Sequence, residues 1–290
     1  MKRGGGISMR AQVTLTPSES KKLLAKAMAA MPLIRKARQK GLIVIHPSST
    51  TLFLVEELLG KRPEGMWVSG LVLPKGMCIS KERQQLGPLH STGGDHVVGK
   101  FAFAWVLEEG VYREGLPLGS LLDRMGKDDV YVKGANAIDP EGKAGVLYAS
   151  LGAGTIGKVI VASKRKRFTI LLPIGLEKLI PTPIAQAAKV ASRENTDVAM
   201  GIPVGLIPVP GKVVTEVEAI DILSGAKAFV VAAGGLGGAE GAVTLVIRGP
   251  DEKVNRALQI IKDVKGATLP EVFPTDCASC WYPTCHLRGT

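Results

Sequence analysis

Short apolar runs bounded by glycine, proline and hydroxyl residues recur along the first two thirds of the chain. The clearest is residues 42–45, four apolar residues followed by His46-Pro47, then by Ser48 to Thr51 and a helical pattern to residue 59. An unbroken apolar run of this length indicates a strand buried on both faces, and the hydroxyl residues are typical of a helix start. The stretch therefore predicts a strand, a tight polar loop and a helix.

The same alternation predicts further strands at 13–16, 67–73, 101–108, 130–133 and 168–173, and helices at 18–31, 33–40, 118–125 and 158–163. Repeated strand, turn and helix units favour right-handed crossovers and a mostly parallel sheet. We therefore expect an α/β domain, with helices on both faces of a mostly parallel sheet, over residues 1–195.

The pattern changes beyond residue 195. Strands are expected at 204–209, 228–233, 242–247 and 271–273, and helices at 215–223 and 251–264. The order β-α-β-β-α-β is that of a ferredoxin-like unit. We expect a smaller α+β ferredoxin-like domain over residues 196–274, followed by a cysteine-rich tail over 275–290.

Composition narrows the classes of partner. The chain has 290 residues and a formal net charge of +11, and 46% of its residues are hydrophobic but only 4% aromatic. Positive charge favours anionic partners, among them nucleic acid, although the low aromatic content argues against a stacking platform for single strands. A generally basic solvated surface explains the charge as well. No helix-turn-helix or zinc-finger spacing indicates sequence-specific DNA reading.

The chain has no run of about 20 apolar residues and no apolar segment after its basic start. We therefore expect a cytoplasmic protein without a membrane partner. Four cysteines in this length do not suggest a disulfide framework.

The Ser48, Ser49, Thr50 and Thr51 loop is the first candidate for ligand binding. Free N–H groups and the dipole at a helix start attract a phosphate or a carboxylate. An ordinary Ser/Thr helix cap explains the same residues without a ligand.

Three segments over residues 18–180 resemble the superfamily of ribose-5-phosphate isomerase, glucosamine-phosphate deaminase and coenzyme A transferase. The Ser48–Thr51 loop resembles its Gly-x-Gly-Ser-Thr phosphate loop. Gly134-Ala-Asn-Ala-Ile-Asp139 resembles its Gly-Ala-Asp-Glu-Val-Asp segment, and Leu151-Gly-Ala-Gly-Thr155 resembles its glycine-rich turn.

The resemblance implies a pocket for a small anionic metabolite, a sugar phosphate or an acyl-CoA, at the carboxyl ends of the strands. Together with the Ser48–Thr51 loop, the resemblance implies nine ligand-binding residues: Ser48, Ser49, Thr50, Thr51, Asn136, Asp139, Gly152, Gly154 and Thr155. Asn136 and Asp139 fit a turn-stabilising pair as well.

The catalytic acids of that superfamily are not matched. The isomerases have acidic residues where Asn136 and Ala137 stand, and no acid follows the glycine turn in Thr155–Lys158. The reaction is therefore left open. His90, Asp95 and His96, in a glycine-rich loop, are candidates for acid and base roles, and an ordinary exposed loop is the alternative.

The tail gathers Cys277, Cys280, Cys285 and His286, and Cys78 is a further candidate if the fold brings it near. Cys-x-x-Cys spacing suits zinc or an iron–sulfur cluster, and a redox dithiol or no function are the alternatives. A second hypothesis follows: a non-catalytic regulatory or assembly protein whose tail senses metal or redox state. We also expect a homo-oligomer, with the smaller domain mediating association.

Overall fold

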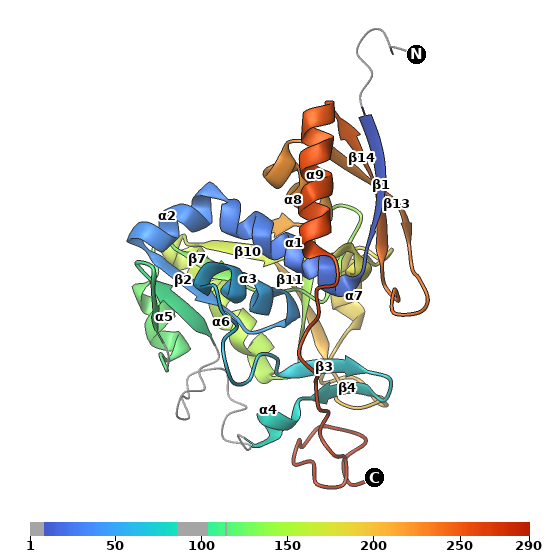
Figure 1. The fold of residues 1–290 in the computed structure, drawn as a ribbon. Coiled ribbons are helices and arrows are strands. Elements are labelled where there is room, and N and C mark those ends of the chain that lie inside the picture. The colour runs from blue at the N-terminus through green and yellow to red at the C-terminus, as the bar shows by residue number, and fades with distance from the viewer. Residues whose placement is uncertain (1–8, 86–103, 114) are drawn as a thin grey trace.

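The structure is a computed structural model that describes residues 9–85, 104–113 and 115–290 (Figure 1). The helices in these residues are α1 (Pro17–Ala30), α2 (Pro32–Lys40), α3 (Ser49–Leu59), α4 (Lys81–Gln85), α5 (Leu118–Arg124), α6 (Gly154–Lys166), α7 (Ile184–Val190), α8 (Glu216–Ser224) and α9 (Asp251–Val264), with 3-10 turns at η2 (Leu151–Ala153) and η3 (Leu176–Lys178). The strands are β1 (Met9–Leu15), β2 (Leu42–Ile45), β3 (Gly70–Leu73), β4 (Gly76–Ile79), β5 (Trp105–Glu108), β6 (Val111–Arg113), β7 (Val130–Val132), β8 (Ala137–Ile138), β9 (Ala144–Tyr148), β10 (Thr169–Pro173), β11 (Gly205–Val209), β12 (Lys212–Val214), β13 (Lys227–Ala233) and β14 (Val243–Gly249).

The largest sheet has six strands in the order β12-β10-β7-β2-β5-β6. The pairings from β12 to β2 are parallel, whereas β5 pairs antiparallel with β2 and with β6. The sheet is therefore mixed, and the expectation of a mostly parallel sheet is not confirmed. A tight turn at Glu109-Gly110, where both residues have positive φ, joins β5 and β6 as a hairpin at the sheet edge and accounts for the antiparallel pairing of these two strands.

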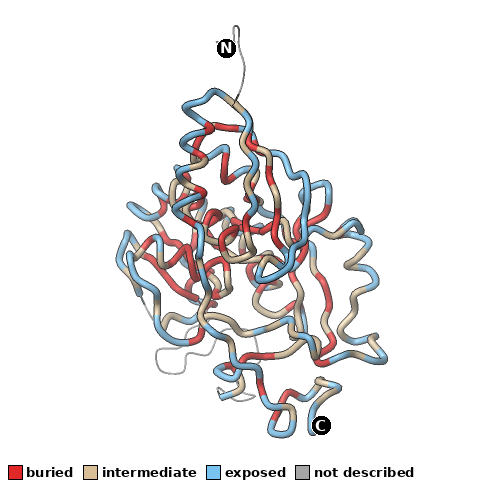
Figure 2. Tube along the Cα trace, turned by 45° about the vertical axis from the view of Figure 1, so that its right-hand side comes forward, coloured by how far each residue is buried: buried red, intermediate tan, exposed pale blue. Residues whose placement is uncertain are grey.

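Helices cover both faces of this sheet. Ile43 and Ile45 of β2 pack with α1, α2 and α3, while Leu42 and Val44 pack with α5 and α6 on the other face. All four residues of β2 are buried, as the apolar run predicted. Figure 2 shows the buried chain concentrated in the middle of the molecule.

A second, three-stranded sheet has the order β1-β14-β13, with both pairings antiparallel. Its apolar side packs on α8 and α9, and its core is continuous with the α1 face of the large sheet. In Figure 1 these strands and α9 form the upper right part of the molecule. The edge strand β13 exposes Phe229 and Val231.

This sheet does not have the strands expected of the ferredoxin-like unit. The run at 204–209 becomes β11, which pairs with β9, and β12 joins the six-stranded sheet. Residues 271–273 form no strand, and β1 from the start of the chain supplies the third strand instead. The reason is that an apolar run predicts a strand but not its partner. Strand pairing thus crosses the expected boundary between residues 195 and 196.

The tail lies against β4 and α4, at the bottom of Figure 1. Thr275 donates its hydroxyl to the Ile79 carbonyl at 3.1 Å, and the Trp281 indole donates to the Gln84 carbonyl at 2.7 Å. The Arg83 guanidinium lies 5.3 Å from the centre of the Trp281 ring. These contacts order the tail in the structure.

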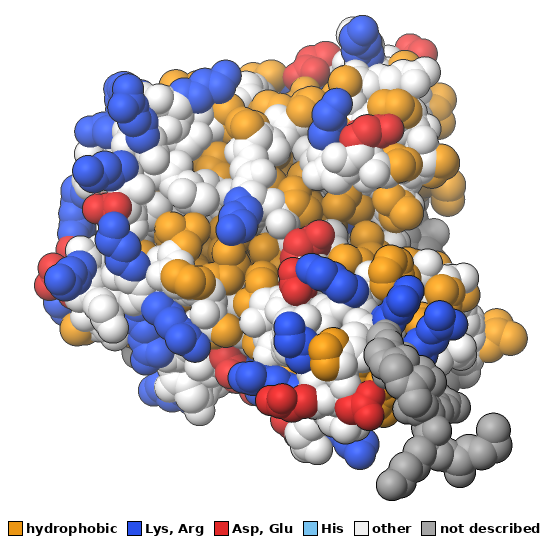
Figure 3. Space-filling view, turned by 90° about the horizontal axis from the view of Figure 1, so that it is seen from above, with side chains coloured by type: hydrophobic (Ala, Val, Ile, Leu, Met, Phe, Trp, Pro, Cys, Tyr) orange, Lys and Arg blue, Asp and Glu red, His pale blue; other side chains and the backbone are white. Residues whose placement is uncertain are grey.

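Two features concern the surface. Within the described ranges, none of the helices combines the length and the apolar character needed to cross a bilayer. The predicted basic helix is α2, which carries Arg35, Lys36, Arg38 and Lys40. In Figure 3, Lys and Arg side chains gather along the left-hand side, where α2 lies in Figure 1.

Candidate functional site

A cavity of about 640 Å³ lies where β2, β7 and the start of α6 meet the β3–β4 hairpin. It is the place where the three predicted ligand segments come together, since its lining includes Ser48, Ser49, Asn136, Gly154 and Thr155. Because β2 and β7 are parallel neighbours, the residues that follow them emerge at one edge of the sheet. The chain direction therefore brings segments far apart in sequence to one cavity.

The Ser48 loop divides into residues that face the cavity and residues that hold the loop. Ser48 caps α3 by accepting the Thr51 N–H at 3.3 Å, and the Thr51 hydroxyl donates to the His46 carbonyl at 2.6 Å. Thr50 and Thr51 are fully buried and do not line the cavity. Only Ser48 and Ser49 therefore present this loop to a ligand.

Asn136 and Asp139, predicted as a pair, lie in different environments. Asn136 is exposed and lines the cavity, and its amide oxygen accepts the Leu147 N–H at 3.0 Å. Asp139 is 2% exposed and lies outside the lining. Its carboxylate accepts the N–H groups of Lys143 at 2.8 Å and Ile184 at 2.9 Å. Asp139 therefore stabilises a turn, which is the alternative to ligand binding that the sequence left open.

The protonation of Asp139 follows from these bonds. Burial by itself raises the pKa of this carboxyl, but the N–H groups of Ile184 and Lys143 outweigh it and lower the pKa below its ordinary value. Asp139 is therefore an ionised structural anchor that joins the turn after β8 to the start of α7.

The glycine turn brings a second helix start to the cavity. Gly152, Ala153 and Gly154 all have positive φ, at 62°, 58° and 53°, so the chain turns sharply into α6. No side chain caps this helix, and its first residues, Gly154 and Thr155, line the cavity. Gly152 lies outside the lining. The N-termini of α3 and α6 both meet the cavity, which suits an anion.

Lys133 and His46 are cavity residues that the sequence analysis did not select. Each is the first residue beyond a buried strand, and backbone bonds fix both: the His46 N–H donates to the Val132 carbonyl at 2.8 Å and the Lys133 N–H to the Leu171 carbonyl at 3.1 Å. Their position directly after the apolar runs 42–45 and 130–132 was the signal that could have found them.

Burial changes the protonation of both groups. It lowers the pKa of Lys133 to about 7. Burial, reinforced by the nearby charge of Lys133, holds the pKa of His46 well below its ordinary value. The Nδ1 atom of His46 lies 3.3 Å from the hydroxyl of Tyr131, which is fully buried and whose pKa burial raises. Near neutral pH, His46 is therefore uncharged and Lys133 exchanges its proton readily.

Two more lysines, Lys21 and Lys178, line the cavity. The ammonium of Lys21 lies 3.6 Å and that of Lys178 3.9 Å from the same oxygen of Glu177. Burial lowers the pKa of Lys178, against the attraction of Glu177. The described lining contains Lys21, Arg83, Lys133 and Lys178 but no Asp or Glu. The cavity therefore has an excess of positive charge.

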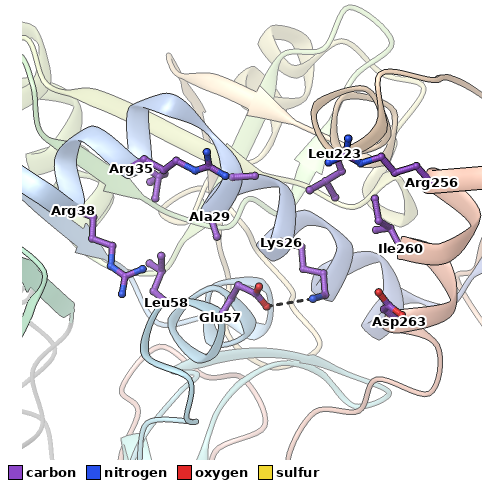
Figure 4. Close-up of a pocket in the computed structure, with 12 residues that line it drawn as sticks. Lys26, Ala29, Arg35, Arg38, Glu57, Leu58, Leu223, Arg256, Ile260 and Asp263 are labelled. Carbon is purple, nitrogen blue, oxygen red and sulfur yellow. Dashed lines mark ion pairs between the residues drawn. The ribbon is translucent and has the colours of Figure 1, made fainter. Parts of the chain in front are cut away.

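A second hollow, of about 530 Å³, lies between α1, α2 and α3 on one side and α8 and α9 on the other (Figure 4). Its walls carry both signs of charge: Lys26 lies 3.7 Å from Glu57, and Arg35, Arg256 and Asp263 are further lining residues. None of the predicted ligand residues lines it. We therefore take the first cavity as the candidate site.

The cysteines lie on the tail side of the molecule. Cys280 is buried beside Ile79 and Ile202, and the Lys75 ammonium donates to the Cys277 sulfur at 3.3 Å. The His286 Nδ1 atom accepts the Ala199 N–H at 2.9 Å. Cys78 lines the cavity, and burial raises the pKa of its thiol. In the part of the chain that the structure describes, no three Cys, His, Asp or Glu residues are grouped to hold a metal ion.

The candidates His90, Asp95 and His96 lie outside the described residues.

No family model, curated protein or solved structure matches this chain. The superfamily resemblance therefore stays a prediction, and the function is argued from the site itself.

Proposed function

We propose that this protein binds a small anionic metabolite, of the sugar phosphate or acyl-CoA type, in the cavity beside Ser48. One observation carries the proposal: four lysine or arginine side chains and two helix N-termini line this cavity, whereas its described lining has no carboxylate. A charge distribution of this kind favours binding of a phosphate or carboxylate group.

The size and the mixed character of the cavity support a metabolite rather than a lone ion. Its volume of about 640 Å³ falls within the range of about 300–1,000 Å³ that small-molecule sites occupy. Trp67, Leu71 and Ile156 give it apolar wall on which a carbon skeleton can pack. Ser49 and Asn136 offer polar groups that can orient hydroxyls of the ligand.

The groups able to move a proton at this site include His46 and Lys133, and the described lining has no Asp or Glu. Both titrate below the ordinary range of their residue type, so both are available as bases near neutral pH. Binding is therefore the proposed function, and the reaction is left unassigned.

Thermal shift and calorimetry with glycerol 3-phosphate, ribose 5-phosphate and coenzyme A test the proposal. At least one of them is expected to bind and to raise Tm, with affinity falling about tenfold or more in Lys133→Met, equivalent to about 1.4 kcal/mol. Lys164→Met is the matched control, because Lys164 is exposed on α6 and does not line the cavity. If none of the three anions stabilises the protein, the proposal is refuted.

A further inference from the structure

We propose that Lys133 is a nucleophile that forms an imine with its ligand, so that the metabolite carries an aldehyde or ketone besides its phosphate or carboxylate group. This inference rests on the proposed function, and it names a substrate class and a covalent role within the same cavity.

The first argument is the placement of Lys133 among the cations of the cavity. Lys21 and Lys178 are both paired with Glu177, and Arg83 stacks on Trp281. The structure shows no ion pair between Lys133 and any described carboxylate. Lys21, Lys178 and Arg83 can contact the anionic group directly. Lys133 adds attraction for the anion in its protonated form, and in its neutral form its amine can meet another part of the ligand.

The second argument is protonation. Only a neutral amine attacks a carbonyl carbon, and burial lowers the pKa of Lys133 to about 7. About half of the Lys133 amine is then neutral at pH 7, compared with roughly one part in 2,500 for an exposed lysine of pKa about 10.4. A desolvated lysine close to other cationic groups is the usual setting of an imine-forming lysine.

The step balances without an oxidant or a reductant. The Lys133 nitrogen lone pair forms a bond to the carbonyl carbon, while the carbonyl π electrons move to oxygen and give a carbinolamine. The nitrogen then loses its protons, the hydroxyl leaves as water, and the C=N bond forms. The sum is amine plus carbonyl giving imine plus one water.

His46 is placed to carry the protons of this step. It follows β2, the strand beside the one that Lys133 follows, and its charge-free ring is close enough for Lys133 to affect its pKa. The Tyr131 hydroxyl contacts Nδ1, and none of the hydrogen bonds found in the described residues involves Nε2. This role requires the tautomer in which the Nδ1–H donates to the Tyr131 oxygen, because the lone pair is then on Nε2, which takes a proton from the amine and returns it to the departing hydroxyl.

Borohydride trapping tests the inference. The protein is incubated at pH 7 with glyceraldehyde 3-phosphate or pyridoxal 5′-phosphate, which carry both groups, then reduced and analysed by intact mass and peptide mapping. We expect about one adduct per chain, located at Lys133 and formed at least 100-fold faster than any adduct at Lys164. Glycerol 3-phosphate, which has no carbonyl, should protect Lys133 by competition.

Two variants separate the covalent step from anion binding. Lys133→Arg keeps the positive charge and is expected to retain glycerol 3-phosphate binding while losing the adduct, whereas Lys164→Met keeps both. If glycerol 3-phosphate binds but no adduct forms at Lys133, or if competition does not prevent the adduct, the imine is refuted and the proposed function stands. If neither anions nor carbonyl compounds bind, both proposals fail.

Discussion

Both carboxylate oxygens of Glu216 accept the backbone N–H of Leu176, at 3.1 and 3.0 Å. Glu216 is fully buried at the first turn of α8, while Leu176 opens the short 3-10 turn that carries Glu177 and Lys178. This contact therefore links α8 to the segment that brings Lys178 into the cavity.

The first prediction concerns the pH dependence of this contact. Burial raises the pKa of Glu216 to about 7, although the Leu176 N–H opposes the shift. The unfolded chain releases this proton near pH 4.5, so the contribution of Glu216 to stability is complete at acid pH and declines between about pH 4.5 and 7. Glu216→Gln should therefore gain stability over the natural chain as pH rises, by on the order of 2–3 kcal/mol at pH 8.

Chemical unfolding of both proteins from pH 4 to 8 measures this difference. At pH 4 the two free energies of unfolding should be close, because a protonated Glu and a Gln both accept from Leu176. Glu252→Gln serves as the control, since Glu252 lies exposed in the first turn of α9. A difference between natural chain and Glu216→Gln that does not change with pH would contradict the assignment.

The second prediction concerns Asp139, which the resemblance assigned to ligand binding. Asp139→Ala removes the acceptor of two backbone N–H groups and should cost about 2–4 kcal/mol. Because the folded pKa lies below the unfolded one, the stabilisation is present above the unfolded pKa and is lost as pH falls through the folded pKa.

Anion affinity is the measurement that separates the two roles of Asp139. The folded fraction of Asp139→Ala should bind glycerol 3-phosphate as the natural chain does, since Asp139 lies outside the cavity lining. Asp139→Asn keeps one oxygen acceptor and should lose less stability. If Asp139→Ala loses much of its affinity for glycerol 3-phosphate but keeps the stability of the natural chain, Asp139 contacts the ligand.

The strand and helix at residues 42–59 could be predicted from sequence, whereas the different roles of Asn136 and Asp139 could not. The buried run 42–45 and the hydroxyl cap after it are local signals, and the structure contains β2 and α3 there. An Asn or Asp after a strand fits a ligand and a turn equally well in sequence. Only the fold shows that Asn136 faces the cavity while Asp139 faces the start of α7.

The missed elements have a common physical cause. An apolar run reveals that a strand is buried but not which strand lies beside it, so β1 and β12 could not be assigned to their sheets. Lys133 and His46 were missed for the same reason, because each gains its properties from burial by elements distant in sequence. A titratable residue directly after a buried parallel strand was the available signal.

The third prediction uses the close approach of Gly134 to the Ser48 loop. A methyl group at residue 134 would lie 2.9 Å from the Ser48 hydroxyl oxygen, closer than side chains normally approach. Gly134→Ala should therefore displace Ser48 and weaken anion binding about tenfold, with a smaller effect on Tm. Gly126→Ala is the control, because nothing lies within 4 Å of its added carbon. Equal affinities of the two variants would mean that Ser48 does not contact the anion.

The last prediction is the pH dependence of anion binding. Protonated Lys133 attracts an anion and neutral Lys133 does not, so affinity should decrease as pH rises through about 7. The other titratable groups of the lining are Lys21, His46, Cys78, Arg83, Tyr148, Lys178 and Tyr282. His46 is already neutral in this range, and Cys78 stays a thiol because burial raises its pKa.

Calorimetry with a sulfate ester measures the effect, because the ester keeps its charge where a phosphate would itself titrate. Between pH 6 and 8.5 we expect the Kd to increase about tenfold. This corresponds to about 1.4 kcal/mol of binding free energy, the contribution of one charge-dependent contact. Lys133→Met should bind weakly at both pH values and lose the dependence, whereas Lys164→Met should keep it. If Lys133→Met retains the full dependence, the titrating group is Lys178, whose pKa burial also lowers, and the role given to Lys133 is wrong.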